Sequence, residues 1–260
     1  MKYLAIGPGA MGVFSLIGAL HSIKDQLDTV EELSGASAGA LIGLCLSLNK
    51  ETDEIFDFLF KIDIVKYYKF KIKNFSNNFG FINLLDSKHL FLDFFGFDPT
   101  FKDLKKKLYI AIYNVNYGRN EYLSVDTHPN MSVIDAMFIS MSIPFLFTST
   151  QFEGNYYVDG GIYEKIPLTP FFGKKKDDVV GIELDFTTVN NKDIFTFMDF
   201  VKCIYTKMIR SCSIEHTSTL FNIIKLKQIA DVSILDFKMS NDDKLKLFFS
   251  GYNQMLANAS

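Results

Sequence analysis

The 260-residue chain contains no tryptophan, has few cysteines and shows no excess of basic residues. Its three cysteines, Cys45, Cys203 and Cys212, are an odd number without metal-type spacing, which predicts reduced thiols in a cytosolic-type compartment. Lysine and arginine total 27, against 30 acidic residues. Nucleic-acid-binding proteins usually carry a basic surplus, so the composition predicts no nucleic-acid partner.

The N-terminal region also lacks an unbroken apolar run. Residues 3–20 carry no charge, but Gly7-Pro8-Gly9 interrupts them after the short apolar segment 3–6. A secretory signal needs roughly 7–15 apolar residues before its cleavage site, and a membrane span needs about 20. The region therefore predicts a strand, a turn and a helix, with a signal peptide or a single span as the alternatives.

Phenylalanine and tyrosine, by contrast, are abundant, with 27 and 12 residues, and they are dense in residues 51–101. The apolar spacing there is mainly helical, and aromatic residues alternate with lysines in Lys66-Tyr67-Tyr68-Lys69-Phe70-Lys71. Such a stretch can lie at a membrane interface, with rings among the headgroups and lysines near anionic lipids. The same aromatic residues could instead form the core of a cap, and the sequence leaves both readings open.

The apolar pattern predicts a parallel α/β sheet with helices on both faces, because a strand-turn-helix unit occurs twice at the start of the chain. No internal repeat or low-complexity linker interrupts residues 1–260, which predicts a single domain. The predicted strands are 3–6, 30–33, 108–115, 121–125, 156–158, 179–185 and 234–237. The predicted helices outside residues 51–101 are 12–23, 40–48, 194–213 and 242–256.

A G-x-S-x-G motif, Gly35-Ala36-Ser37-Ala38-Gly39, stands between a predicted strand and a predicted helix. A sharp turn at this place lifts the serine oxygen above the sheet edge, and the flanking glycines relieve the crowding. The N-terminus of the following helix also presents free N–H groups to a developing negative charge. The motif therefore predicts Ser37 as a nucleophile. The rest of this nucleophile elbow is Gly35, Ala38 and Gly39.

An earlier G-x-G-x-x-G motif, residues 7–12, is compatible with two functions. A dinucleotide-binding loop needs an acidic residue about 20 positions later, at the carboxyl end of the next strand. Glu31 and Glu32 have this separation but lie inside the predicted strand. The other function is an oxyanion loop, whose backbone amides point at the carbonyl oxygen under attack. The predicted oxyanion-loop residues are Gly7, Gly9, Ala10 and Gly12.

A third motif, Asp159-Gly160-Gly161, follows the predicted strand 156–158. The three motifs, in this order and spacing, resemble those of the patatin-like phospholipase family. Further similarity lies in 133–136, 140–145, 154–167 and 246–255, so the resemblance covers roughly the whole chain.

This resemblance implies a three-layer α/β/α sandwich with a mainly parallel central sheet. It implies a serine lipid acyl hydrolase, with Ser37 as nucleophile, Asp159 as general base and Gly160 and Gly161 completing the base motif. Hydrolysis would pass through an acyl-enzyme intermediate, without a metal or other cofactor. The implied substrate is a phospholipid or acylglycerol at a membrane or lipid-aggregate surface, and the expected localisation is cytoplasmic with peripheral membrane association.

The resemblance implies no catalytic histidine. The expected role of all four histidines is an ordinary surface one, although His216 could complete a conventional triad in a different hydrolase fold. The four are His21, His89, His128 and His216.

The first loop departs from the family's usual G-G-G-x-R/K-G pattern. Pro8 replaces the middle glycine, and Met11 replaces the basic residue. Proline has no N–H, so one oxyanion donor is missing, a loss that costs about 2.7–4 kcal/mol of transition-state binding in other enzymes. The amides of Gly9 and Ala10, with Ala38 at the elbow, must then suffice. The alternative function is a weakly active or inactive lipid-binding or scaffolding member of the family.

Overall fold

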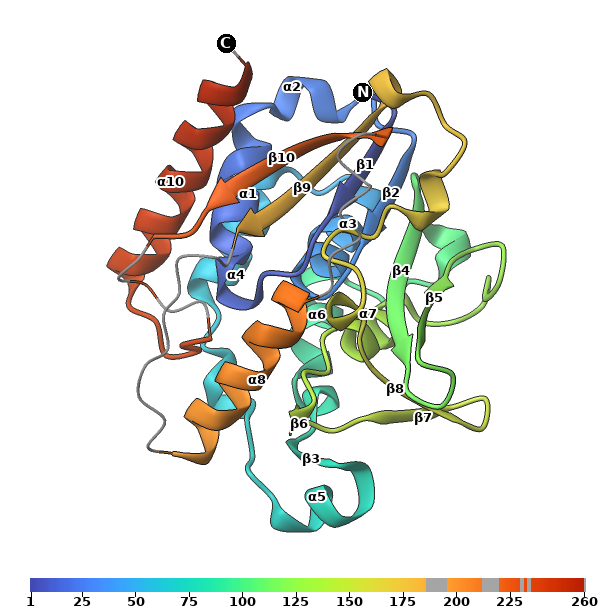
Figure 1. Ribbon diagram of the computed structural model, residues 1–260, viewed down its shortest axis with the longest axis vertical. Helices are drawn as coiled ribbons and strands as arrows, with labels where there is room; N and C mark the ends of the chain where they lie inside the picture. Colours follow the sequence, from blue (N-terminus) through green and yellow to red (C-terminus); the bar gives the residue numbers. More distant parts are fainter. Residues whose placement is uncertain (186–195, 212–219, 230–231, 233–234, 260) are drawn as a thin grey trace.

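The computed structural model describes residues 1–185, 196–211, 220–229, 232 and 235–259, and it centres on one mixed eight-stranded sheet (Figure 1). The strand order is β10-β9-β1-β2-β4-β8-β7, and β5 pairs with β4. Neighbours from β10 to β4 are parallel, whereas β5, β8 and β7 pair antiparallel. A separate small parallel sheet joins β3 and β6. The strands are β1 (Tyr3–Ile6), β2 (Glu32–Gly35), β3 (Gly80–Ile82), β4 (Lys107–Asn114), β5 (Arg119–Leu123), β6 (Phe145–Phe147), β7 (Thr150–Phe152), β8 (Asn155–Asp159), β9 (Val179–Asp185) and β10 (Asn222–Lys227).

Helices lie on both sides of the large sheet, as expected for an α/β/α sandwich (Figure 1). The helices are α1 (Val13–Ser22), α2 (Lys24–Leu27), α3 (Ala38–Ser47), α4 (Thr52–Lys61), α5 (Ile72–Asn78), α6 (Lys88–Phe95), α7 (Val133–Ser140), α8 (Phe197–Ser211) and α10 (Asn241–Ala259). None of the helices in the described ranges is long and apolar enough to cross a membrane.

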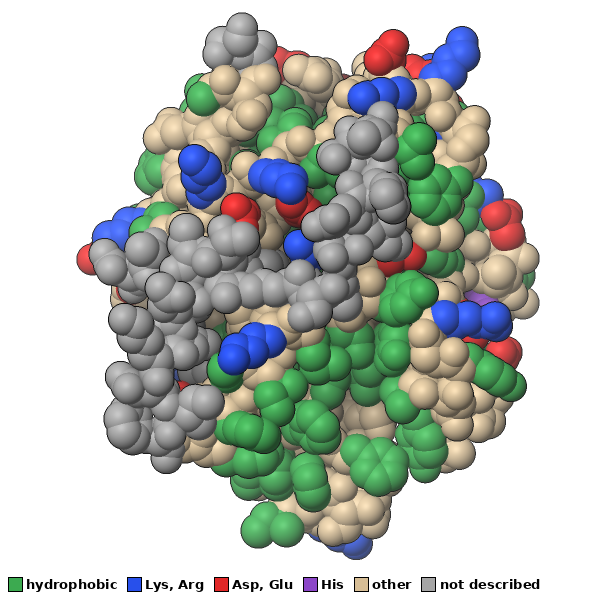
Figure 2. Space-filling model, in the orientation of Figure 1, with side chains coloured by type: hydrophobic (Ala, Val, Ile, Leu, Met, Phe, Trp, Pro, Cys, Tyr) green, Lys and Arg blue, Asp and Glu red, His purple; other side chains and the backbone are tan. Residues whose placement is uncertain are grey.

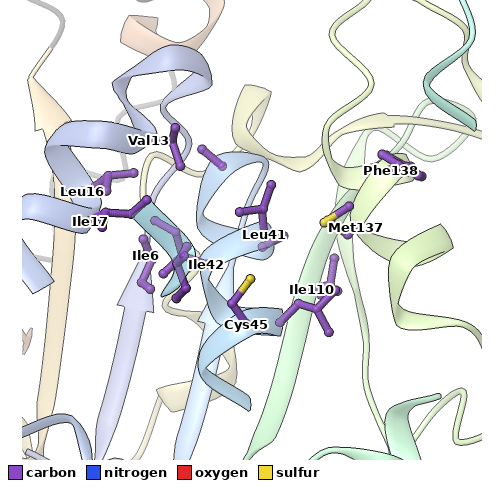
Figure 3. Packing of buried hydrophobic residues seen from close by; sticks show 14 of the residues in the cluster. Ile6, Val13, Leu16, Ile17, Leu41, Ile42, Cys45, Ile110, Met137 and Phe138 are labelled. Carbon is purple, nitrogen blue, oxygen red and sulfur yellow. The ribbon is translucent and has the colours of Figure 1, made fainter. Parts of the chain in front are cut away.

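Helix α3 lies at the centre of the main hydrophobic core. Every residue from Ala38 to Ser47 is buried, because the helix is apolar all round. Figure 3 shows its side chains Leu41 and Ile42 between those of α1, such as Ile17, and those of the β4–α7 side, such as Ile110. The helix that follows the predicted nucleophile is therefore fixed by packing from all directions.

Most elements predicted from the sequence are confirmed, and the first 23 residues form the expected strand, turn and helix. The prediction of a last strand at 234–237 is wrong. Leu235 and Phe237 lie in turns and bury their side chains against the core from a loop, while residues 233–234 lie outside the described residues. The last strand in the described part of the chain is β10, an edge strand in which Leu226 alone is fully buried, so that it gave no strong apolar signal. The second strand begins two residues later than predicted, at Glu32.

Two of the three cysteines, Cys45 and Cys203, are free and buried, as predicted for reduced thiols. Cys212 lies outside the described residues, as do the predicted ends of the long helix at 194–195 and 212–213.

The C-terminal helix α10 packs along α1 with unusually close backbone contact (Figure 1). A Cβ atom on Gly251 would overlap the carbonyl oxygen of Ser15, and one on Gly18 would overlap that of Phe248. The Ser15 hydroxyl also donates to the Leu247 carbonyl at 3.0 Å. The middle of α10 is therefore fixed against α1.

We predict that Gly251→Ala destabilises the protein, although alanine normally favours a helix by about 1 kcal/mol over glycine. The added methyl group must push α10 away from α1, which should lower the free energy of unfolding by about 1–3 kcal/mol. Urea denaturation measures this, with the exposed neighbour Asn253→Ala as the control. A Gly251→Ala protein as stable as the control would contradict the close contact.

Candidate active site

Ser37 sits on a strained turn between β2 and α3. Its φ of 54° and ψ of −119° lie in a region that residues with a side chain rarely adopt. The turn also brings the start of α3 against β1, where a Cβ on Gly39 would overlap the Ile6 carbonyl oxygen. The glycine of the motif is thus required by close approach, and the strained serine matches the geometry of a nucleophile elbow.

Ser140, at the end of α7, fixes the elbow to the sheet. Its hydroxyl oxygen accepts a hydrogen bond from the Ser37 amide at 2.9 Å. The same hydroxyl donates to the Ala111 carbonyl on β4 at 2.6 Å. The sequence interpretation included Ser140 only in a stretch of family similarity and gave it no role.

Asp159 is the last residue of β8 and is completely buried. Gly35 on β2 pairs with Ile110 of β4, and Asp159 pairs with Ile112 of the same strand. The serine turn and the aspartate therefore flank the same part of β4. The Asp159 side chain accepts the Gly161 amide at Oδ1, at 2.7 Å.

The second oxygen of the carboxylate has a partner that the sequence did not reveal. The Tyr205 hydroxyl, on α8, donates to Asp159 Oδ2 at 3.0 Å. Burial, and then the Asp159 charge, raise the pKa of Tyr205 well above its usual value, so the phenol keeps its proton. Only the spacing of apolar residues marked this stretch, and no local motif distinguishes Tyr205 from a core tyrosine.

The electrostatics of Asp159 suit a proton acceptor. Burial raises its pKa to about 6, while the Gly161 amide, the Ser37 hydroxyl and the Tyr205 hydroxyl oppose that rise. A carboxyl group with this pKa is mostly ionised at pH 7 and is a stronger base than an exposed aspartate.

Of the four predicted oxyanion-loop residues, two present free amides. The Gly7 amide donates to the Ile182 carbonyl at 2.9 Å, and the Gly12 amide donates to Gly9 at 2.7 Å. Within the described part of the chain, the amides of Gly9 and Ala10 have no acceptor, nor does that of Ala38 at the elbow. These three donors are available to a ligand oxygen.

Pro8 contributes to the site by contact. A Cβ on Gly161 would lie 2.5 Å from the Pro8 ring, so the base motif and the first loop touch here. Pro8 thus packs the loop against the Asp159 turn, although it gives the loop no backbone N–H donor at this position.

A dinucleotide-binding role for the first loop conflicts with the position of the acids. Glu32 begins β2, whereas the carboxyl end of that strand, beside Ile6 and the loop, is Gly35. The Glu32 carboxylate is already held by the Tyr109 hydroxyl at 3.1 Å and the Lys174 amine at 3.3 Å.

The three histidines within the described ranges form contacts of their own. His21 Nδ1 is 2.9 Å from the Thr52 hydroxyl, and His128 Nε2 is 3.4 Å from Glu153. His89 is exposed and packs its ring against Tyr67. His216 lies outside the described residues.

A cavity of about 640 Å³ opens beside the elbow, in the size range of small-molecule sites. Ala10 and Met11 of the first loop, Ala38 of the elbow and Met141 form one part of its wall. Most of the remaining wall is apolar, and those side chains are Val13, Phe14, Leu41, Leu59, Phe60, Ile62, Val65, Tyr68, Phe91, Phe237 and Met239.

The fold and the three glycine-rich turns define an α/β protein with a serine at a nucleophile elbow. A sequence model of the family described as patatin-like phospholipase matches residues 4–172, and the chain belongs to that family of lipid hydrolases. The match ends before α8, so it does not include Tyr205.

Similar sequences occur in two viruses. "Uncharacterized protein R571" of Acanthamoeba polyphaga mimivirus is 28% identical, over 96% of this chain and 91% of its own length. "Probable lipid hydrolase 463L" of Invertebrate iridescent virus 6 is 26% identical, over 72% of this chain and 71% of its own length.

Two solved structures share the fold. VipD from Legionella pneumophila superposes with a TM-score of 0.58 at 15% identity, over 98% of this chain and 66% of VipD. ExoU in its complex with SpcU, from Pseudomonas aeruginosa, gives 0.60 at 15% identity, over 100% of this chain and 51% of that chain. The protein therefore matches about half to two thirds of these longer chains.

The Asp159–Tyr205 contact predicts a specific pH dependence. A carboxylate that serves as a general base must be ionised, so this role predicts that kcat/KM for ester hydrolysis rises with pH to a plateau, with a midpoint near pH 6. Tyr205→Phe removes a hydrogen bond that favours the ionised form. The midpoint should therefore move upward by roughly 0.5–1 pH unit.

The control is Tyr109→Phe, a partly buried tyrosine that bonds Glu32 instead. A Tyr205→Phe enzyme with an unshifted midpoint would show that Tyr205 does not tune Asp159.

Proposed function

We propose that the protein hydrolyses carboxylic esters of lipids with Ser37 as nucleophile and Asp159 as general base. The observation that carries this proposal is the Ser37 hydroxyl on its strained turn, beside a buried carboxylate whose pKa is raised to about 6. A serine needs an adjacent base to become nucleophilic, and among the described side chains around Ser37 Asp159 is the one that can accept a proton.

In the first step, Ser37 Oγ attacks the ester carbonyl while its proton passes to Asp159. The developing oxyanion accepts hydrogen bonds from the free amides of Gly9, Ala10 and Ala38. The tetrahedral intermediate then collapses, and the leaving alcohol takes the proton from Asp159. This leaves the acyl group bound to Ser37.

In the second step, Asp159 accepts a proton from water as the water oxygen attacks the acyl-enzyme. Collapse breaks the bond to Ser37, returns the proton to its oxygen and releases the fatty acid. Tyr205 and the Gly161 amide hold the carboxylate in position throughout.

The apolar cavity beside the elbow suits the acyl chain. Its wall includes Ala10 and Ala38, whose amides belong to the proposed oxyanion site, so the cavity adjoins that site. The name of the 463L relative, a probable lipid hydrolase, supports a lipid substrate.

A second function, lipid binding without efficient turnover, has one observation in its favour. Pro8 lacks an N–H, so the site has one fewer donor than the family pattern provides. Hydrolysis assays on the variants below separate this function from catalysis.

The substrate lies in a lipid surface, and residues 70–81 provide a contact area. Phe70, Ile72 and Phe79 are 57%, 75% and 52% exposed. Phe70 and Phe75 both stack on Phe81, at centroid distances of 4.2 and 4.7 Å. Figure 2 shows hydrophobic side chains spread over the lower part of this face, where α5, β3 and β6 lie in Figure 1.

Exposed lysines alternate with the apolar residues at the start of this segment, namely Lys69, Lys71 and Lys73. Rings that insert among headgroups, with cations beside them, are typical of proteins that bind anionic membranes reversibly. The sequence left open whether these aromatic residues form core or surface. Aromatic residues of this region form core as well as surface. Phe58 of α4 packs against Phe91 of α6, and Phe91 is buried.

Substitution of either proposed catalytic residue should remove ester hydrolysis. Asp159→Asn keeps an oxygen for the Gly161 amide but accepts no proton, so kcat/KM should fall by about 10²–10⁴-fold. For Ser37→Ala, kcat/KM should fall by at least as large a factor.

Thermal unfolding of the same variants supplies the folding control. The raised pKa of Asp159 means that its ionised form destabilises the native state, increasingly as pH rises from about 4 to above 6. Asp159→Asn should therefore melt no lower than the natural protein at pH 7. An active, well-folded Asp159→Asn enzyme would exclude the dyad.

Replacing Phe70 and Phe79 with serine should weaken binding to vesicles that contain anionic phospholipid by about tenfold, because each exposed ring contributes apolar area at the interface. Vesicle sedimentation measures the partition coefficient. Val115→Ser, which removes an exposed apolar residue in the β4–β5 turn, is the control. Equal partitioning of the two proteins would place the membrane contact elsewhere.

A further inference from the structure

The cavity beside Ser37 contains positive charge as well as apolar surface. Four charged residues line it, and three of them are exposed at its opening while the fourth is buried. The exposed ones are Lys61, Asp63 and Lys238. The buried one is Lys244, in the first turns of α10, with 8% of its surface exposed.

Lys244 has an incomplete set of partners. Its ammonium donates to the Phe60 carbonyl at 3.2 Å and lies over the rings of Phe60 and Phe14, 5.4 and 5.7 Å from their centroids. An ammonium has three N–H donors, and the carbonyl uses one. Among the described residues no carboxylate lies within ion-pair distance of it.

The other charges do not neutralise this ammonium. Lys61 pairs with Asp57 at 2.9 Å, and Asp63 pairs with Lys66 at 3.5 Å. Lys238, like Lys244, forms no ion pair with a described residue. The cavity therefore has two ammonium groups without a carboxylate partner, and one of them is buried.

A buried ammonium without an anion is unfavourable. Burial lowers the pKa of Lys244, and the charge of Asp63 opposes that effect only in part. An anionic oxygen bound in the cavity would replace the hydration that the Lys244 ammonium has lost, through charge-assisted hydrogen bonds.

We propose that Lys244, assisted by Lys238 at the opening, binds the phosphate of a phospholipid whose ester lies at Ser37. This inference rests on the proposed ester hydrolysis and specifies its substrate class. A phosphodiester carries a permanent negative charge close to the glycerol esters, whereas a diacylglycerol offers only hydroxyl and ester oxygens. The protein should therefore select phospholipids over acylglycerols with the same acyl chains.

Binding tests this selection independently of catalysis. A Ser37→Ala protein is titrated calorimetrically with a diether phosphatidylcholine and with the matching dialkylglycerol, both in the same neutral-detergent micelles. The phospholipid should bind at least about tenfold more tightly. Lys244→Met in this background should reduce the preference below about threefold, because one charge-assisted interaction is lost.

Lys246→Met is the matched control, since Lys246 is exposed on the same helix and does not line the cavity. Lys238→Met should show a smaller loss of preference, and it provides a second variant should Lys244→Met melt below the natural protein. Equal binding of the two lipids by Ser37→Ala would overturn the inference.

Hydrolysis gives the second readout. Lys244→Met should lower kcat/KM for the ester phospholipid by about 10–100-fold and change that for diacylglycerol by less than about threefold. Equal losses on both lipids would indicate a packing role and contradict phosphate binding. Inhibition by oleate, a fatty-acid product, is measured with the same variant. If Lys244→Met weakens this inhibition and leaves the lipid preference unchanged, the ammonium binds the product carboxylate, and the inference would also be overturned. A natural protein that cleaves neither lipid would refute the proposed function, while the calorimetric comparison would still decide the phosphate site.

Discussion

The proposed chemistry depends on one buried carboxylate that is kept in position and partly shielded from water. Asp159 ends an antiparallel strand inside the sheet, with the Gly161 amide on one oxygen and the Tyr205 hydroxyl on the other. Burial raises its pKa, and these donors limit the rise. The balance leaves a group that is ionised at neutral pH and still basic. A serine nucleophile without a catalytic histidine needs such a group as its single base. The cost appears in stability, since an ionised carboxylate in this place favours unfolding as the pH rises.

Close backbone packing brings the parts of the site together. Gly39 lets α3 begin directly against β1, Gly161 lets the base motif touch Pro8, and Ser140 joins the elbow to β4. Each contact connects elements that are distant in the sequence. The C-terminal helix α10 is fixed on α1 in the same manner and carries Lys244 to the cavity wall. The proposed nucleophile, base and phosphate ligand thus belong to one continuous core.

The sequence predicted the parts that depend on local pattern. The glycine turns at residues 7–12, 35–39 and 159–161 could be recognised because each motif places a fixed geometry between a strand and the next element. Tyr205 and Lys244 could not, because helix periodicity shows which face is buried and not which distant group a side chain meets. The edge strand β10 was missed for a related reason: few of its side chains are buried, so the apolar pattern at 234–237 was the stronger and misleading signal.

The most direct test of the central claim is covalent labelling with a fluorophosphonate, followed by peptide mapping in a mass spectrometer. Such probes react with serines that an adjacent base has activated. The account predicts one adduct on Ser37, formed in the natural protein and strongly reduced in Asp159→Asn. An adduct on another residue, undiminished labelling of Asp159→Asn, or no labelling of folded protein supplied with vesicles would contradict a Ser37–Asp159 dyad.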